Sequence, residues 1–149
     1  MMLLSRRSLL AIAAVVDIAI HARPMPVAAK LLAARHNLPP RHLETILQAL
    51  VRASILKGVR GPRGGYELAR ERRRITAGEI VRAAMATSED QSAPVPESKL
   101  VETIIGPVVQ EAGEAFLLKL DAVTVEELCR RAEGRAVFSD VPAAADFAI

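Results

Sequence analysis

Residues 37–74 read NLPPRHLETILQALVRASILKGVRGPRGGYELARERRR, and this stretch decides the fold. Its first half predicts an amphipathic helix that follows a short turn. Apolar residues recur there at i, i+3, i+4, i+7 and i+8, which is one stripe at helical period: Leu43, Ile46, Leu47, Leu50 and Val51. The opposite face carries side chains rich in hydrogen-bond donors: Arg41, Thr45, Gln48 and Arg52.

The second half of the stretch predicts a hairpin. Two β-leaning runs, 55–60 and 66–70, flank the sequence Gly61-Pro62-Arg63-Gly64-Gly65, whose residues suit a tight turn. A helix with a polar, basic outer face beside a glycine-tipped hairpin that bears arginines is the outline of a winged helix-turn-helix. We therefore interpret this stretch as a DNA-binding module.

The residues before this stretch predict two more helices. Ser5 is a suitable N-cap for the first, and its apolar residues repeat at helical spacing: Leu9, Ala13, Val16 and Ile20. Prolines at 24 and 26 end that helix, because proline cannot continue an interior helical turn. A second helix is expected over residues 27–36, buried through Val27, Leu32 and Ala33. A turn over residues 37–40 joins it to the amphipathic helix, which completes a helix-turn-helix unit.

The N-terminus has an alternative interpretation. Ser5-Arg6-Arg7-Ser8-Leu9-Leu10 followed by AIAAVV resembles a twin-arginine export signal. Asp17 interrupts the apolar run, and no Ala-x-Ala-like cleavage site follows. A first core helix is therefore the preferred interpretation, and a small exported protein remains the alternative.

The residues after the hairpin predict a second helical region. Residues 70–74 carry four arginines and one glutamate, which we interpret as a mobile basic edge. Thr76 and Glu79 match a capping box for a helix that ends near residue 86. A long helix is expected over residues 99–120, with a kink or restart at Gly106-Pro107. Residues 124–127 form another capping box before a last short helix that ends near residue 132.

The charge is distributed unevenly along the chain. The net charge of +3 is the sum of a net charge of +10 in residues 1–85 and a net charge of −7 in residues 86–149. A basic front half is expected where phosphates must be neutralised, and an acidic back half should stay off the duplex. Aromatic residues make up only 3%, so an aliphatic core is expected, which favours helix packing over a β-sandwich.

The helix-turn-helix geometry assigns candidate contacts to DNA. The N-terminal residues of its second helix approach base edges in the major groove, which selects Arg41, His42 and Thr45, with Gln48 one turn deeper. In the wing, Arg60 and Arg63 can reach phosphate or a narrow minor groove, while Gly61 and Gly64 let the backbone approach. The alternatives are an ordinary solvent-exposed helix face and an ordinary hairpin.

Signals for catalysis, metal binding and membrane insertion are poor. The three histidines lack metal-ligand spacing, and neither a nucleophile elbow nor a P-loop pattern is present. Cys129 is the single cysteine, so no intrachain disulfide or cysteine metal site can form. A buried structural thiol is the preferred interpretation of Cys129, with redox sensing as the alternative. No apolar run reaches the roughly 18 residues that cross a bilayer.

The motifs resemble those of one family. The runs LPPRHLETILQAL, ILKGVRGPRGGYELAR and ITAGEIVRAA are similar to the Rrf2 family of bacterial transcription regulators over about residues 3–86. The resemblance implies a homodimer on a palindromic promoter site, with recognition contacts from Arg41, His42 and Thr45 and a wing with Arg60 and Arg63. It also implies that a long C-terminal helix forms the dimer interface, which selects Val101, Ile104, Ile105, Val108, Ala112 and Phe116.

One departure from the family pattern concerns the cofactor. Cluster-binding members carry three cysteines between the helix after the wing and the dimer helix, whereas residues 87–98 contain none. A cysteine-ligated iron–sulfur cluster is therefore not expected there, and no metal or other cofactor is predicted. The effector, whether a protein or a small molecule, is not identified by the sequence.

Together these features predict a mostly α-helical chain with a small two-stranded β-wing. A winged helix-turn-helix domain is expected in residues 1–86, a linker in 87–98, dimerisation helices in 99–133 and a flexible tail in 134–149. The predicted function is a cytoplasmic, sequence-specific regulator of transcription that acts as a repressor and binds double-stranded DNA and no membrane. The alternative is a regulator that kept the fold but acts by binding a partner protein.

Overall fold

A computed structural model describes residues 4–86 and 97–138. Within these residues the helices are α1 (Arg6–His21), α2 (Ala29–Arg35), α3 (Pro40–Arg52), α4 (Ala77–Met85), α5 (Gly106–Asp121) and α6 (Val125–Gly134). Two short helical turns accompany them, η1 (Arg72–Arg74) and the π-helical η3 (Val101–Ile105). Strands β1 (Leu56–Val59) and β2 (Gly65–Leu68) form one antiparallel hairpin. The expected class, mostly α with a two-stranded wing, is confirmed.

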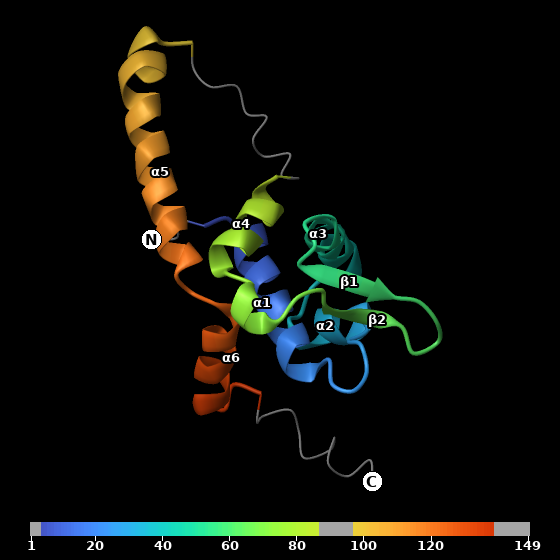
Figure 1. Cartoon of the computed structure of the whole chain (residues 1–149). Coiled ribbons are helices and arrows are strands. Elements are labelled where there is room, and N and C mark those ends of the chain that lie inside the picture. The colour runs from blue at the N-terminus through green and yellow to red at the C-terminus, as the bar shows by residue number, and fades with distance from the viewer. Residues whose placement is uncertain (1–3, 87–96, 139–149) are drawn as a thin grey trace.

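Helix α1 lies at the centre of the arrangement. It packs against α3, α4, α6 and β2, while α2 packs against α3. Figure 1 shows the hairpin on one side of this body and α5 standing along the other side. The wing and α5 therefore reach out from a common helical core in different directions.

The core confirms the stripe predicted for α3. Leu43, Ile46, Leu47 and Leu50 are at most 2% exposed, and Val51 is half-buried against them. The stripe predicted for α1 is only partly confirmed. Val16 and Ile20 are half-buried against the core, but the fully buried face is formed by Ala11, Ala14, Val15 and Ile18, and Leu9 is 39% exposed. Small alanine side chains let α4 and α6 pack closely against α1. The residues of α1 that face these helices are therefore the buried ones, even where they are small.

The segment before α2 is extended and not helical, which corrects the predicted start of that helix. Val27 is buried as expected, but it pairs with Tyr66 next to the wing. The Val27 N–H donates to the Tyr66 carbonyl at 2.9 Å, and the Tyr66 N–H donates to the Val27 carbonyl at 2.8 Å. Val27 thus pairs with the outer edge of β2, and this pairing connects the base of the wing to the segment that leads into α2.

The prediction of a mobile basic edge over residues 70–74 is wrong for Arg70 and Arg72, which are held by partners elsewhere in the fold. Arg70 donates to the Ser54 carbonyl at 3.2 Å and to the Glu79 carboxylate at 3.1 Å. Arg72 donates to Glu126 at 2.9 Å, across 54 residues of sequence. Composition alone could not reveal these partners, because the contacts arise only when the helices pack.

The C-terminal helices agree in outline with the sequence. Thr76 and Glu79 form the predicted capping box at the start of α4. The expected restart at Gly106-Pro107 takes the form of the π-helical turn η3, in which the Gly106 N–H bonds the Val101 carbonyl. A proline without an N–H cannot continue the α-helical ladder there.

Helix α6 belongs to the N-terminal body in this chain. Thr124 caps it by accepting from the Glu127 N–H at 3.1 Å, and Val125 and Cys129 are fully buried in the core beside α1. The expected grouping of residues 99–133 as one dimerisation unit therefore differs from the observed packing. Residues 87–96 of the expected linker and 139–149 of the expected tail lie outside the described residues.

Candidate nucleic-acid interface

Helix α3 presents the predicted recognition residues on its outer face. Arg41, His42, Thr45 and Gln48 are all exposed, opposite the buried leucine stripe. Pro40 occupies the first turn of the helix, where its missing N–H costs no helical hydrogen bond. The Thr45 hydroxyl donates to the Arg41 carbonyl at 3.2 Å, so its oxygen lone pairs face outward as acceptors. The face can therefore both donate and accept hydrogen bonds at base edges.

The position of α3 depends on a buried ionic cluster that the sequence analysis missed. Asp17 of α1 is 0% exposed, and Arg35 at the end of α2 donates to its carboxylate twice, at 2.8 and 2.6 Å. His36 Nε2 lies 2.8 Å from one Asp17 oxygen, and His21 Nδ1 lies 3.0 Å from the other. His36 is the last residue before the turn into α3, so the cluster fixes where the recognition helix begins. We call Asp17, His21, Arg35 and His36 the aspartate cluster.

A signal for this cluster was present in the sequence. An aspartate inside an apolar helical run is almost never fully buried without a charged partner. The position of Asp17 therefore indicated a buried ion pair as well as an interruption of an export signal. Arg35 and His36 could not be named as partners from the sequence, because Arg35 ends a different helix and His36 follows it.

The wing is held in shape by its glycines. Gly61 has φ +119°, in the left-handed region that other residues rarely adopt. The Gly64 N–H donates to the Gly61 carbonyl at 2.9 Å, and a Cβ at Gly64 would lie 2.3 Å from the Val59 carbonyl oxygen. This tight turn carries Arg60 and Arg63, and both are exposed.

Two shallow hollows border these elements. One, of about 350 Å³, lies between the start of α1 and α3 and is lined by Arg6, His42 and Thr45 among others. The other, of about 470 Å³, lies between the start of α2 and the wing and includes Arg60, Gly61 and Gly64. Part of the predicted set therefore lines concave surface: His42 and Thr45 from the recognition face, and Arg60, Gly61 and Gly64 from the wing.

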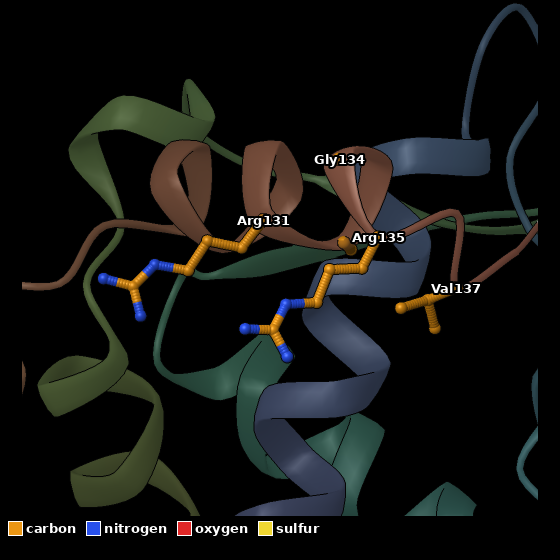
Figure 2. Close-up of a pocket in the computed structure, with 5 residues that line it drawn as sticks. Arg131, Gly134, Arg135 and Val137 are labelled. Atoms are coloured by element: carbon orange, nitrogen blue, oxygen red, sulfur yellow. The ribbon is translucent and has the colours of Figure 1, made fainter.

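A third hollow lies elsewhere. It measures about 680 Å³ at the end of α6, where Arg131 and Arg135 are among the residues that line it (Figure 2). Ala132, Gly134 and Val137 complete its lining. None of the predicted DNA-contact or dimer residues belongs to it.

The residues predicted for the dimer interface lie on η3 and α5. Ile104 and Val108 are 59% and 61% exposed, Ile105 and Ala112 are exposed, and Val101 and Phe116 are half-buried. Leu100, which directly precedes η3, is also exposed, as are Val109 and Leu118 of α5. This run of large apolar side chains is not covered by any described part of the chain.

Comparison with known proteins gives the family. The sequence profile of Rrf2, described as an iron-dependent transcriptional regulator, matches residues 4–131. The chain belongs to the Rrf2 family. It is therefore a DNA-binding regulator of transcription, and the family consists of regulators rather than enzymes.

Relatives along nearly the whole chain agree with this assignment. Protein rrf2 of Nitratidesulfovibrio vulgaris is 31% identical over 142 residues, which cover 88% of this chain and 89% of that protein. The HTH-type transcriptional regulator CymR of Bacillus subtilis is 31% identical over 109 residues, covering 73% and 76%. Among solved structures, T. potens IscR superimposes with a TM-score of 0.70 at 28% identity over 90% of each chain.

The iron dependence in the Rrf2 description can be tested against the residues of this chain. Its single cysteine, Cys129, is buried at 0% exposure in α6. Burial raises the pKa of the Cys129 thiol, and the neighbouring Arg72 only partly opposes that shift. In the part of the chain that the structure describes, no group of three or more His, Cys, Asp or Glu residues is arranged to hold a metal ion. The residues therefore do not fit a cysteine-ligated iron–sulfur cluster.

The lengths and apolar content of the described helices bear on whether one of them could cross a bilayer. None of them combines the length and apolar character that a transmembrane segment requires.

Proposed function

We propose that this Rrf2 regulator binds a palindromic promoter site as a homodimer and represses transcription by occluding the promoter. The exposed basic face of α3 beside an arginine-tipped wing is the observation that carries this proposal. Two recognition helices would enter successive major grooves about 34 Å apart, with the wings flanking them. Such a regulator would act in the cytoplasm, where bacterial promoters lie.

The proposed contacts divide by chemistry. Arg41 can pair bidentately with guanine and Gln48 with adenine, while His42 and Thr45 lie near the same base edges. At the wing, Arg60 and Arg63 would contact phosphate or a narrow minor groove, since Gly61 and Gly64 keep the backbone free of bulky side chains. The helix would therefore supply sequence discrimination, and the wing would supply mainly affinity.

The proposed dimer uses the apolar face of η3 and α5. Val101, Ile104, Ile105, Val108, Ala112 and Phe116 line it, and exposed apolar runs of this size on a soluble helix normally mark an interface. A second copy of the same face is self-complementary around a two-fold axis, which is the usual arrangement of a dimer. A two-fold dimer in turn requires a palindromic site.

The signal to which the regulator responds is proposed to be something other than a cysteine-ligated cluster. One cysteine cannot supply the three ligands that cluster-binding members use, and Cys129 is buried in the core. A small molecule or a partner protein remains as the effector class.

Binding measurements with three variants test the proposed contacts. Sites selected by wild-type protein from random duplexes would first define the operator. Arg41→Ala should weaken binding by roughly 1–3 kcal/mol at one base position, whereas Arg63→Ala should weaken binding to all sequences and reduce the salt slope by about one. Arg130→Ala is the matched control, because it removes one exposed arginine from α6, away from both elements. Unchanged affinity of Arg63→Ala at every salt concentration would remove the wing from the interface.

A further inference from the structure

Helices α4 and α5 meet more closely than side chains normally permit. Gly78, buried in the first turn of α4, faces Asp121 at the end of α5. A Cβ at Gly78 would lie 1.9 Å from the Asp121 Oδ1 and 3.0 Å from the Asp121 backbone nitrogen. An added methyl group would overlap the Asp121 carboxylate, which would have to move, and it would press on the backbone of α5.

The same carboxylate is gripped from one helical turn further along α4. Arg82 donates to both Asp121 oxygens, at 2.6 and 2.9 Å. These hydrogen bonds lower the pKa of the Asp121 carboxyl, so the pair stays charged across the neutral range. Gly78 sets how near the two helices lie, and Arg82 sets their rotation, because a bidentate pair is satisfied in one geometry.

Backbone hydrogen bonds also hold the start of α4 in place. The Ala77 N–H donates to the Val123 carbonyl at 2.8 Å, and the Val125 N–H donates to the Ile75 carbonyl at 2.8 Å. The start of α4 is therefore linked by side chains to the end of α5, and by main chain to the connection between α5 and α6. We call Gly78, Arg82 and Asp121 the α4–α5 joint.

The joint lies at the base of a lever. At 1.5 Å per residue, the 16 residues of α5 extend for about 24 Å. Figure 1 shows α5 rising from this point with its N-terminal end clear of the other helices, and the exposed Ile104 and Val108 lie toward that end. A rotation of about 10° at the joint would move the far end by about 4 Å, which exceeds the 3.4 Å rise of one base pair.

We propose that the α4–α5 joint determines the half-site spacing that the dimer accepts. This inference rests on the proposed function, in which α5 pairs two copies on a palindromic site. The angle at which α5 leaves the DNA-binding body fixes where the partner's recognition helix falls along the duplex. Gly78, Arg82 and Asp121 thus act as positioning residues for specificity, although none lies on α3 or on the wing.

Gly78→Ala and Arg82→Gln test the proposal on a panel of duplexes. The panel carries the two half-sites selected by the wild-type protein, with the central spacer shortened or lengthened by one or two base pairs. Gly134→Ala is the control, because a Cβ there meets nothing within 4 Å and the exchange is also glycine to alanine in a helix. Circular dichroism and sedimentation establish that each variant is folded and dimeric.

The expected results differ between the variants. Gly78→Ala should lose about tenfold in affinity at the wild-type spacing, or prefer a spacing altered by one base pair, while its affinity for a duplex with one half-site is unchanged. Arg82→Gln inserts no atoms and should flatten the preference, so that affinities for neighbouring spacings converge. Gly134→Ala should match the wild type at every spacing.

The same panel separates failure of this inference from failure of the proposed function. A folded, dimeric Gly78→Ala protein with the wild-type optimum and affinity would overturn the role of the joint. If Gly78→Ala does not fold, Arg82→Gln decides, and an unchanged spacing profile overturns the proposal. Wild-type protein that binds single half-sites but shows no spacing preference would overturn the palindromic dimer itself.

Discussion

Asp17→Asn gives a sharp test of the aspartate cluster. The substitution keeps the shape of the side chain but replaces one acceptor oxygen by an NH₂ group. Each Asp17 oxygen accepts from Arg35 and from one histidine, so whichever oxygen is replaced, Arg35 loses an acceptor and faces a donor. A histidine can change tautomer to become an acceptor, but a guanidinium cannot. The loss is therefore concentrated on the buried Asp17–Arg35 pair.

The magnitude follows from the burial of the pair. Removing one partner from a buried ion pair costs about 3–5 kcal/mol, because the other charge is left unpaired. Arg35 retains 22% side-chain exposure, so water can partly rehydrate it, and we expect a loss near the lower limit, about 3 kcal/mol. For a chain of 149 residues this corresponds to a fall in Tm of roughly 6–12 °C.

The chain contains its own control for this prediction. Asp121→Asn makes the same exchange in another bidentate aspartate–arginine pair, but there the side chains are 30% and 46% exposed. An exposed pair contributes about 0–1 kcal/mol, so Asp121→Asn should be nearly neutral. Urea unfolding followed by circular dichroism at one fixed protein concentration measures both. A difference below about 0.5 kcal/mol between the two variants would refute the reasoning that burial makes Asp17 structurally important.

Three further predictions concern the wing, the dimer face and the thiol. Gly64→Ala should weaken DNA binding with little loss of helical signal, because a Cβ would push the Val59 carbonyl and distort only the wing; filter binding and circular dichroism check it. Val108→Asp should dissociate the dimer in sedimentation while leaving each protomer folded, since Val108 is 61% exposed in one chain. Cys129 should resist iodoacetamide at pH 7.5 until urea unfolds the protein, because burial raises its pKa. The folded chain favours the neutral thiol, so Cys129 should also contribute a loss of stability above about pH 8.5 that Cys129→Ala removes.

The features that the sequence predicted well are local. The buried stripe of α3, its exposed polar face and the Thr76 capping box each depend on residues within two helical turns of one another. The glycine-rich turn of the wing is likewise encoded within five residues, because Gly61 needs a backbone conformation that few other residues accept. Such patterns can be read without knowing how the helices pack.

The features that were predicted wrongly or missed are contacts between distant segments. Val27 is extended rather than helical because it pairs with Tyr66 at the edge of β2. Arg72 is held in place because it donates a hydrogen bond to Glu126. The buried face of α1 was misjudged for a related reason, since four elements surround that helix and a single stripe cannot describe its environment. In each case the contacting residue lies far away in the sequence, so the spacing of apolar residues within one helix or strand could not reveal it.

The two aspartate–arginine pairs of this regulator differ in burial, and therefore in how much free energy is needed to separate them. Asp17 and Arg35 lie inside the DNA-binding body, where separating them is expensive, so the start of the recognition helix keeps one position. Asp121 and Arg82 are partly exposed, and displacing them costs about 0–1 kcal/mol. Allosteric effectors typically supply 1–3 kcal/mol of coupling, which exceeds the contribution of the exposed Asp121–Arg82 pair but not that of the buried Asp17–Arg35 pair. In the proposed dimer, a signal should therefore change the spacing of the two DNA-binding bodies rather than the way each body binds its half-site.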